Sequence, residues 1–160
     1  MGAITMKNAT GKFLTDRGDV ARLVQAQRQI DPNAQCNRCI ENSLRYTRMH
    51  PDAGPVFGWC IGDFVVGRGT AIIPHCWVRD AQGRDIDITP VPANARDSFD
   101  YVTDFDVFDL FLDDQIWLYP LRLTPALGYQ VRIAAEEYVD VLDVKLNTLK
   151  QYAARPLEFT

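Results

Sequence analysis

The chain has 160 residues, of which 47% are hydrophobic and 24% are charged, and these proportions are typical of a folded globular domain rather than a disordered chain. The formal net charge of −4 argues against a nucleic-acid-binding surface, because phosphate binding requires clustered Lys and Arg. Four cysteines are too few for a disulfide scaffold. We therefore expect one domain over residues 1–160 and no nucleic-acid partner.

The sequence carries no targeting or membrane signal that we recognise. Residues 1–13 lack the apolar core of a secretory signal, and no apolar run reaches the length of about 18 residues that a transmembrane helix needs. We expect a cytoplasmic protein with no membrane partner. Export by a signal-independent route would leave the same sequence features.

Two helices are predicted in the first third of the chain. Apolar residues recur at helical spacing over 17–30, with Asp16 or Asp19 as a cap, and Pro32 restricts the backbone where that pattern ends. A second helical pattern runs over about 37–49 and stops before Pro51. The residues that carry the first pattern are Val20, Leu23, Val24, Ala26 and Ile30.

The period then changes to that of strands. Residues 56–66, 71–80 and 83–89 are predicted as strands, and the second and third are joined by a short turn with Gly83 in the favoured position. Residues 90–104 are expected to be irregular.

The last third of the chain predicts one further strand and one helix, over 115–123 and 133–150. Helices followed by sheet-forming segments indicate the α+β class, with early helices packed on an antiparallel sheet.

Three residues in this arrangement could together activate a thiol. Cys39 lies in the first turn of the predicted second helix, where the helix N-terminus favours a thiolate. His75 lies in the middle of a strand and could act as its base, while a carboxylate on the adjoining strand could orient the imidazole. An ideal hairpin places residue 77 opposite 87, and diagonal neighbours are also within side-chain reach. Asp85 and Asp87 share a face, so spacing alone does not choose between them.

The order of a helix-borne Cys, a strand-borne His and an Asp on the next strand resembles the transglutaminase-like branch of the papain-like cysteine enzymes. The resemblance is closer to a set of small bacterial proteins with four short motifs, and it covers residues 35–90. It implies a papain-like, transglutaminase-like fold. The counterparts in this chain are Cys39-Ile40-Glu41-Asn42, Gly58-Trp59, His75-Cys76-Trp77 and Asp87-Ile88-Thr89-Pro90.

The resemblance also implies residue roles. It implies a catalytic triad of Cys39, His75 and Asp87, where Asp87 is preferred over Asp85 because Asp-x-Thr-Pro is the shared spacing. The oxyanion hole would combine the Cys39 backbone N–H with a side-chain amide. Gln35 is the first candidate for that amide and Asn37 the second.

Supporting roles are expected for three further residues. Asn42 would be a buried polar group that ties the helix to the sheet. Trp59 and Trp77 would belong to the core or form walls of the cleft. The activity implied is acyl transfer from a protein or peptide amide, by a peptidase, deamidase or transglutaminase, without a cofactor.

Two alternatives remain open. Cys36-x-x-Cys39 has zinc-knuckle spacing, and Cys60 with His75 or Cys76 could complete four ligands in a small zinc-stabilised interaction protein. The chain could also be a catalytically silent binding module on the same fold.

Overall fold

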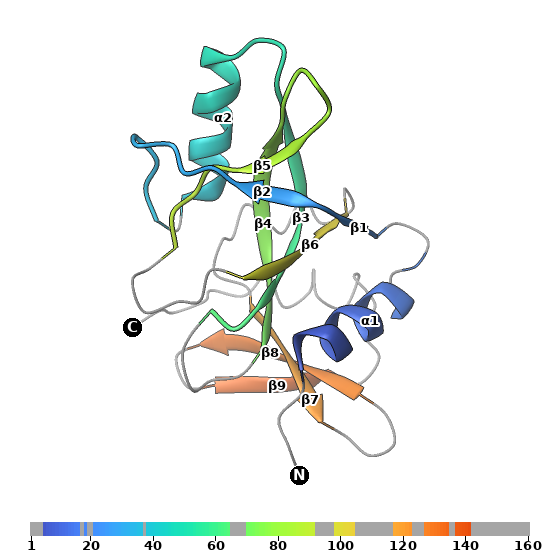
Figure 1. Ribbon diagram of the computed structural model, residues 1–160. Coiled ribbons are helices and arrows are strands. Elements are labelled where there is room, and N and C mark those ends of the chain that lie inside the picture. The colour runs from blue at the N-terminus through green and yellow to red at the C-terminus, as the bar shows by residue number, and fades with distance from the viewer. Residues whose placement is uncertain are drawn as a thin grey trace.

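The computed structural model describes residues 5–16, 18, 21–36, 38–64, 70–91, 98–104, 117–122, 127–134 and 137–141. It contains two helices in these ranges, α1 (Met6–Asp16) and α2 (Cys39–Met49). The prediction of a helix over about 37–49 is confirmed for Cys39–Met49. The fold class is mixed α+β, as the sequence indicates (Figure 1).

The strands form one twisted sheet. Along its main path the order is β1-β6-β3-β4-β7-β8-β9, and β5 joins β4 to β2 beside that path. Their bounds are β1 Arg22–Val24, β2 Ala26–Arg28, β3 Gly54–Gly62, β4 Ala71–Arg79, β5 Asp85–Asp87, β6 Phe99–Thr103, β7 Trp117–Arg122, β8 Leu127–Ala134 and β9 Glu137–Val141.

The segment 22–28 closes part of this sheet on itself. Its first half, β1, pairs antiparallel with β6, and its second half, β2, pairs parallel with β5. Since β6, β3, β4 and β5 are already neighbours in that order, six strands curl into a closed sheet. The sheet is therefore mixed, and the expectation of a purely antiparallel one is wrong.

Three sequence predictions are corrected by the strands. Residues 22–28 are extended rather than helical, because pairing with two strands outweighs a weak helical pattern in which Leu23 and Ile30 are exposed. Residues 99–103 form β6 instead of irregular chain. Strands β8 and β9 replace the start of the helix predicted over 133–150, and residues 142–150 lie outside the described ranges.

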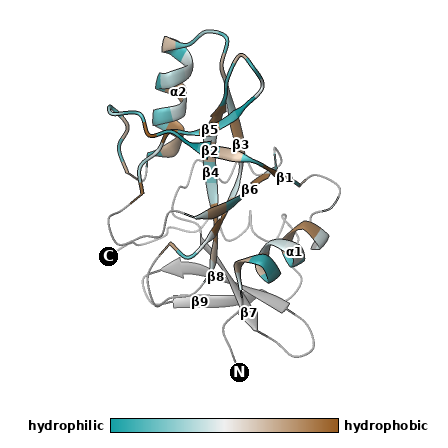
Figure 2. Ribbon diagram, viewed as in Figure 1, coloured by the Kyte–Doolittle hydropathy of each residue, from teal (hydrophilic) through white to brown (hydrophobic). Residues whose placement is uncertain are grey.

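The closed sheet has an inner face, which points into the curl, and an outer face that carries the helices. Val56, Cys60, Trp77 and Tyr101 form the inner hydrophobic cluster. On the outer face α2 packs on Val78, Ile86 and Ile88 through Tyr46, while α1 packs on Trp59 through Phe13. Both helices mix hydrophilic and hydrophobic residues, as one-sided packing requires (Figure 2).

Strands β7, β8 and β9 lie at the opposite end of the long strand β4 from α2 (Figure 1). Among the described residues, no helix is long and apolar enough to cross a membrane.

Candidate functional site

The candidate nucleophile begins a helix. Cys39 is the first residue of α2 and is buried, with 9% of its surface exposed. Within the described part of the chain, the N-cap residue Arg38 makes no side-chain cap hydrogen bond and pairs with Glu41 instead. The first backbone N–H groups of a helix have no intrahelical acceptor, so this end of α2 favours an anion at Cys39.

His75 lies on the inner face of β4 and contacts the carboxylate that the sequence predicts for it. Its Nε2 atom lies 2.9 Å from Oδ2 of Asp87. Burial alone would lower the pKa of His75, but the charge of Asp87 and hydrogen bonds to Asp87 and Cys39 outweigh it and raise this pKa to about 10. Because Nε2 is occupied by Asp87, Nδ1 is the ring nitrogen left to exchange a proton with the thiol.

The β4–β5 hairpin explains how His75 reaches Asp87. Val78 pairs with Ile86 and Arg79 with Asp85, so residue 77 lies opposite 87 and His75 contacts Asp87 diagonally. The turn at 80–84 is closed by backbone hydrogen bonds, and Gly83 has a φ of 76°, which a side chain would disfavour. The predicted register and turn are therefore confirmed.

The same register separates the two aspartates. Asp85 binds Arg79 through two hydrogen bonds of 2.8 and 3.1 Å at the rim of the hairpin. Asp87 is fully buried and contacts His75. The geometry thus selects Asp87 as the partner of the imidazole.

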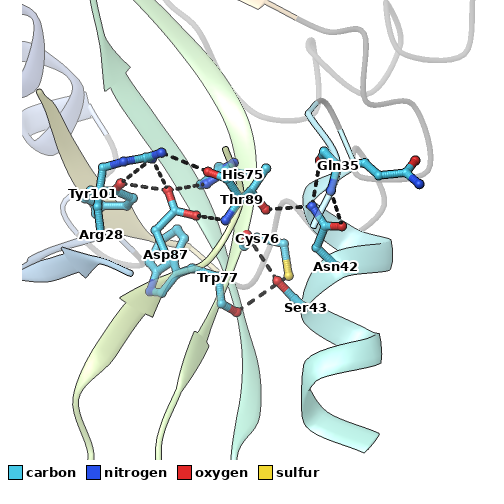
Figure 3. Close-up of polar contacts among 10 residues, drawn as sticks. All are labelled: Arg28, Gln35, Asn42, Ser43, His75, Cys76, Trp77, Asp87, Thr89 and Tyr101. Atoms are coloured by element: carbon cyan, nitrogen blue, oxygen red, sulfur yellow. Dashed lines mark hydrogen bonds and ion pairs between the residues drawn. The ribbon is translucent and has the colours of Figure 1, made fainter. Parts of the chain in front are cut away.

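Asp87 is held by donors from three other strands and from the residues that follow its own strand (Figure 3). Tyr101 of β6 donates a hydrogen bond of 2.7 Å to Oδ2, and Arg28 of β2 donates one of 2.9 Å to the same oxygen. The backbone N–H of Thr89 donates to Oδ1 at 3.1 Å. Burial alone would raise the pKa of Asp87, but the charge of His75 and these donors lower it below its usual value.

Thr89 and Asn42 connect this carboxylate to the nucleophile helix. Asn42 Nδ2 donates to Thr89 Oγ1 at 3.1 Å and to the backbone oxygen of Gln35 at 2.8 Å, and its Oδ1 accepts from the Gln35 N–H. The buried amide thus ties α2 to the sheet, as expected, and holds the segment that leads into Cys39 (Figure 3).

Of the two candidate oxyanion amides, the structure describes only that of Gln35, and it is not brought to the site. Gln35 is exposed, and its side chain extends away from His75 in Figure 3. Its backbone, rather than its amide, is what the site uses. Asn37 lies outside the described residues.

The two tryptophans lie on opposite faces. Trp77 lies on the inner face, with its ring 6.2 Å from His75 and stacked nearly parallel to it, so it does border the site. Trp59 points outward, where its ring meets Phe13 at 5.3 Å and its Nε1 donates to Asp104. The expectation that Trp59 could form a cleft wall is wrong, because side chains alternate along β3.

Arg28, Tyr101 and the bonding role of Thr89 were not predicted from the sequence. Arg28 falls in the segment interpreted as a helix, and Tyr101 in the segment interpreted as irregular. The alternation of Phe99, Tyr101 and Thr103 is a strand signal that could have located β6. No sequence signal connects Arg28 to Asp87, since their contact depends on parallel pairing of β2 with β5.

The described cysteines do not gather into a metal site. Cys36 is exposed, whereas Cys39, Cys60 and Cys76 are buried, and all four are free thiols. Within the described ranges, no group of three His, Cys, Asp or Glu side chains could hold a metal ion. Burial raises the pKa of the Cys76 thiol to about 12, and it raises the pKa of Cys60 well above its usual value.

Comparisons of the chain with protein-family models, with curated proteins and with solved structures give no match.

Proposed function

We propose that this chain is a cysteine-dependent acyl-transfer enzyme that acts on a protein or peptide amide. The observation that carries the proposal is the buried contact of 2.9 Å between His75 and Asp87, together with Cys39 at the start of α2, whose thiol contributes to the raised pKa of the same imidazole. A thiol, a base and a group that orients the base are the parts that nucleophilic catalysis requires. The proposal includes a papain-like, transglutaminase-like arrangement of these elements.

In the proposed reaction, proton transfer from Cys39 to His75 gives a thiolate–imidazolium pair, which the raised pKa of His75 favours, and the thiolate then attacks the carbonyl carbon of the amide. A C–S bond forms while the carbonyl electrons move to oxygen, where the backbone N–H of Cys39 stabilises the charge. The C–N bond then breaks, and the imidazolium of His75 gives its proton to the leaving amine. Water or a second amine then gives a proton to His75 and attacks the thioester carbon, and the C–S bond breaks, which releases the acyl product and regenerates the Cys39 thiolate.

Asp87 supports these steps without transferring a proton. Its hydrogen bond to Nε2 fixes the ring so that Nδ1 faces the thiol, and its charge stabilises the imidazolium. The lowered pKa of Asp87 keeps the carboxylate ionised throughout. A reducing compartment such as the cytoplasm, which we also propose, would keep the thiol free.

The test is the reactivity of each thiol with iodoacetamide as a function of pH, with adducts located by mass spectrometry. We expect Cys39 to react fastest near or below neutral pH, although it is buried, while exposed Cys36 serves as an internal reference of ordinary accessibility. His75→Ala should abolish the advantage of Cys39, and Asp87→Asn should reduce it. Circular dichroism would verify that both variants remain folded.

A folded wild type in which Cys39 reacts no faster than a thiol with the usual pKa of about 8.5 would contradict the proposal. A catalytically silent binding module would then be the better account of the site.

A further inference from the structure

The carboxylate of Asp87 accepts more hydrogen bonds than are needed to orient one imidazole, and one of its donors is a permanent cation. Its Oδ2 atom accepts from His75, Tyr101 and Arg28 at 2.9, 2.7 and 2.9 Å. The ion pair of Arg28 with Asp87 is largely removed from solvent, with side-chain exposures of 14% and 0%. An interaction of this kind is far less screened than a surface ion pair.

Arg28 is placed there by several independent contacts. Parallel pairing sets Arg28 beside Asp87 in the register of β2 with β5, and the next residue, Gln29, donates its N–H to the Asp87 carbonyl at 2.9 Å. The second guanidinium nitrogen donates to the Thr89 carbonyl at 2.9 Å, and the guanidinium lies 5.4 Å from the Phe99 ring. The cation is thus built into the closed sheet (Figure 3).

The charges of Cys39, His75 and Asp87 explain why a second cation stabilises this buried site. A thiolate at Cys39 and a carboxylate at Asp87 are two anions, and the imidazolium of His75 alone can balance only one of them. An unbalanced charge in a buried site is costly. A guanidinium remains protonated at every accessible pH, so it balances Asp87 permanently.

We infer that Arg28 is a positioning residue that serves as the permanent counter-ion of Asp87 and thereby leaves the charge of His75 to stabilise a thiolate at Cys39. This inference rests on the proposed function and deepens it, because it names what sets the pH range of the same site. Arg28 acts through Asp87 and is not itself a group that touches the reacting atoms.

Other titratable groups face the same centre, and each is accounted for. Tyr101 and Cys60 have raised pKa values, chiefly through burial, so both remain neutral. Asp85 is already paired with Arg79. Among the described residues, the titratable groups that interact with His75, Asp87 or Cys39 are Cys60 from β3, Cys76 from β4, Arg28 from β2 and Tyr101 from β6, while Asp85 lies at the rim of the hairpin with Arg79.

The first test compares the alkylation of Cys39 in Arg28→Gln and wild type across pH. Loss of the cation disfavours the thiolate, so the rise of the rate with pH should move to higher pH, and the rate at pH 6 should fall about tenfold for each unit of displacement. Arg28→Lys should retain most of the wild-type rate. Arg79→Gln is the matched control, because it removes an arginine from a neighbouring Arg–Asp pair outside this network and should leave the profile unchanged.

The second test is an NMR titration of the two histidines, which is independent of Cys39 chemistry. With Asp87 unbalanced, His75 holds its proton more tightly, so the midpoint of its titration should lie at higher pH in Arg28→Gln than in wild type, where Asp87 already raises this pKa. An unchanged His75 titration in folded Arg28→Gln would overturn the inference. A shifted titration with an unreactive wild-type Cys39 would instead sustain the role of Arg28 and contradict the proposed enzyme.

Arg28→Lys keeps the inference testable if Arg28→Gln does not fold, because it preserves the buried charge. Because its charge is kept, its His75 titration and the rate of Cys39 alkylation at each pH should lie closer to those of wild type than to those of Asp87→Asn. A loss as large as that of Asp87→Asn would overturn the role of counter-ion, since charge alone would then be insufficient.

Discussion

At the residue scale, the short run from Asp87 to Thr89 joins all the polar parts of the site. Asp87 faces His75, and the backbone N–H of Thr89 donates a hydrogen bond of 3.1 Å to Oδ1 of Asp87. The Thr89 hydroxyl accepts from Asn42, which holds the approach to Cys39. A threonine two residues after the carboxylate therefore has a physical role, because one residue links the orienting group to the nucleophile helix.

Replacing Thr89 with Val should remove the hydrogen bond that links the Asp87 segment to the helix of Cys39. The variant leaves one Asn42 N–H without its acceptor in a buried position, which costs about 1–3 kcal/mol of unfolding free energy. We also expect slower alkylation of Cys39, because the segment at Gln35 is held by the same amide. Urea denaturation and the alkylation assay measure the two effects.

Thr89→Ser is the matched control, since it keeps the hydroxyl and removes only a methyl group. Equal stability of the Val and Ser variants would show that the hydroxyl of Thr89 contributes nothing to the site.

At the element scale, the close approach of β3 to β6 depends on Gly58. A Cβ at this position would collide with the Val102 carbonyl oxygen and would lie 2.8 Å from Cη2 of Trp77 and 2.9 Å from Cα of Thr103. Gly58 pairs with His75 across β3 and β4, so the space it leaves is where the Trp77 ring lies beside the imidazole. The missing side chain thus shapes the inner face of the closed sheet.

Gly58→Ala should consequently destabilise the protein by about 1–3 kcal/mol or more, because backbone atoms cannot yield as a flexible side chain would. Gly54→Ala on the same strand is the control, since no described atom lies within 4 Å of the Cβ it would add. Thermal or urea unfolding of both variants measures the difference. Similar stabilities would contradict the packing described for Gly58.

The elements also show which parts of the fold the sequence could predict. The helix from Cys39 and the β4–β5 hairpin follow from local patterns and a Gly turn, and their register brings His75 within diagonal reach of Asp87. The choice of Asp87 over Asp85 came from the resemblance and not from spacing. Strands β1 and β2 could not, because each is three residues long and is stabilised by partners far along the chain. The contact of Arg28 with Asp87 depends on that closure, and it was missed for the same reason.

At the scale of the whole molecule, the buried charges make the free energy of unfolding fall at both low and high pH. The pKa of Asp87 is lowered in the folded protein, so its contribution is present above the unfolded value of 3.8 and is lost as the pH falls through the folded value. The pKa of His75 is raised, so its contribution is complete below 6.5 and is lost as the pH rises to about 10. Cys76, with its pKa raised from 9.0 to about 12, adds a further loss above pH 9.

The interval between pH 7 and 8 therefore reports mainly on His75, because the raised pKa values of the Cys60 and Cys76 thiols lower stability chiefly at higher pH. There the native state retains a proton that the unfolded state releases, so each pH unit lowers the unfolding free energy by up to about 1.4 kcal/mol. Urea denaturation across this interval should show the decline in wild type and in His50→Gln, since His50 is exposed and outside the site. In His75→Gln, the unfolding free energy should change little over the same pH interval. A decline of equal slope in His75→Gln would mean that a group other than His75 retains the proton, and the strong coupling of this imidazole to Asp87 would then be wrong.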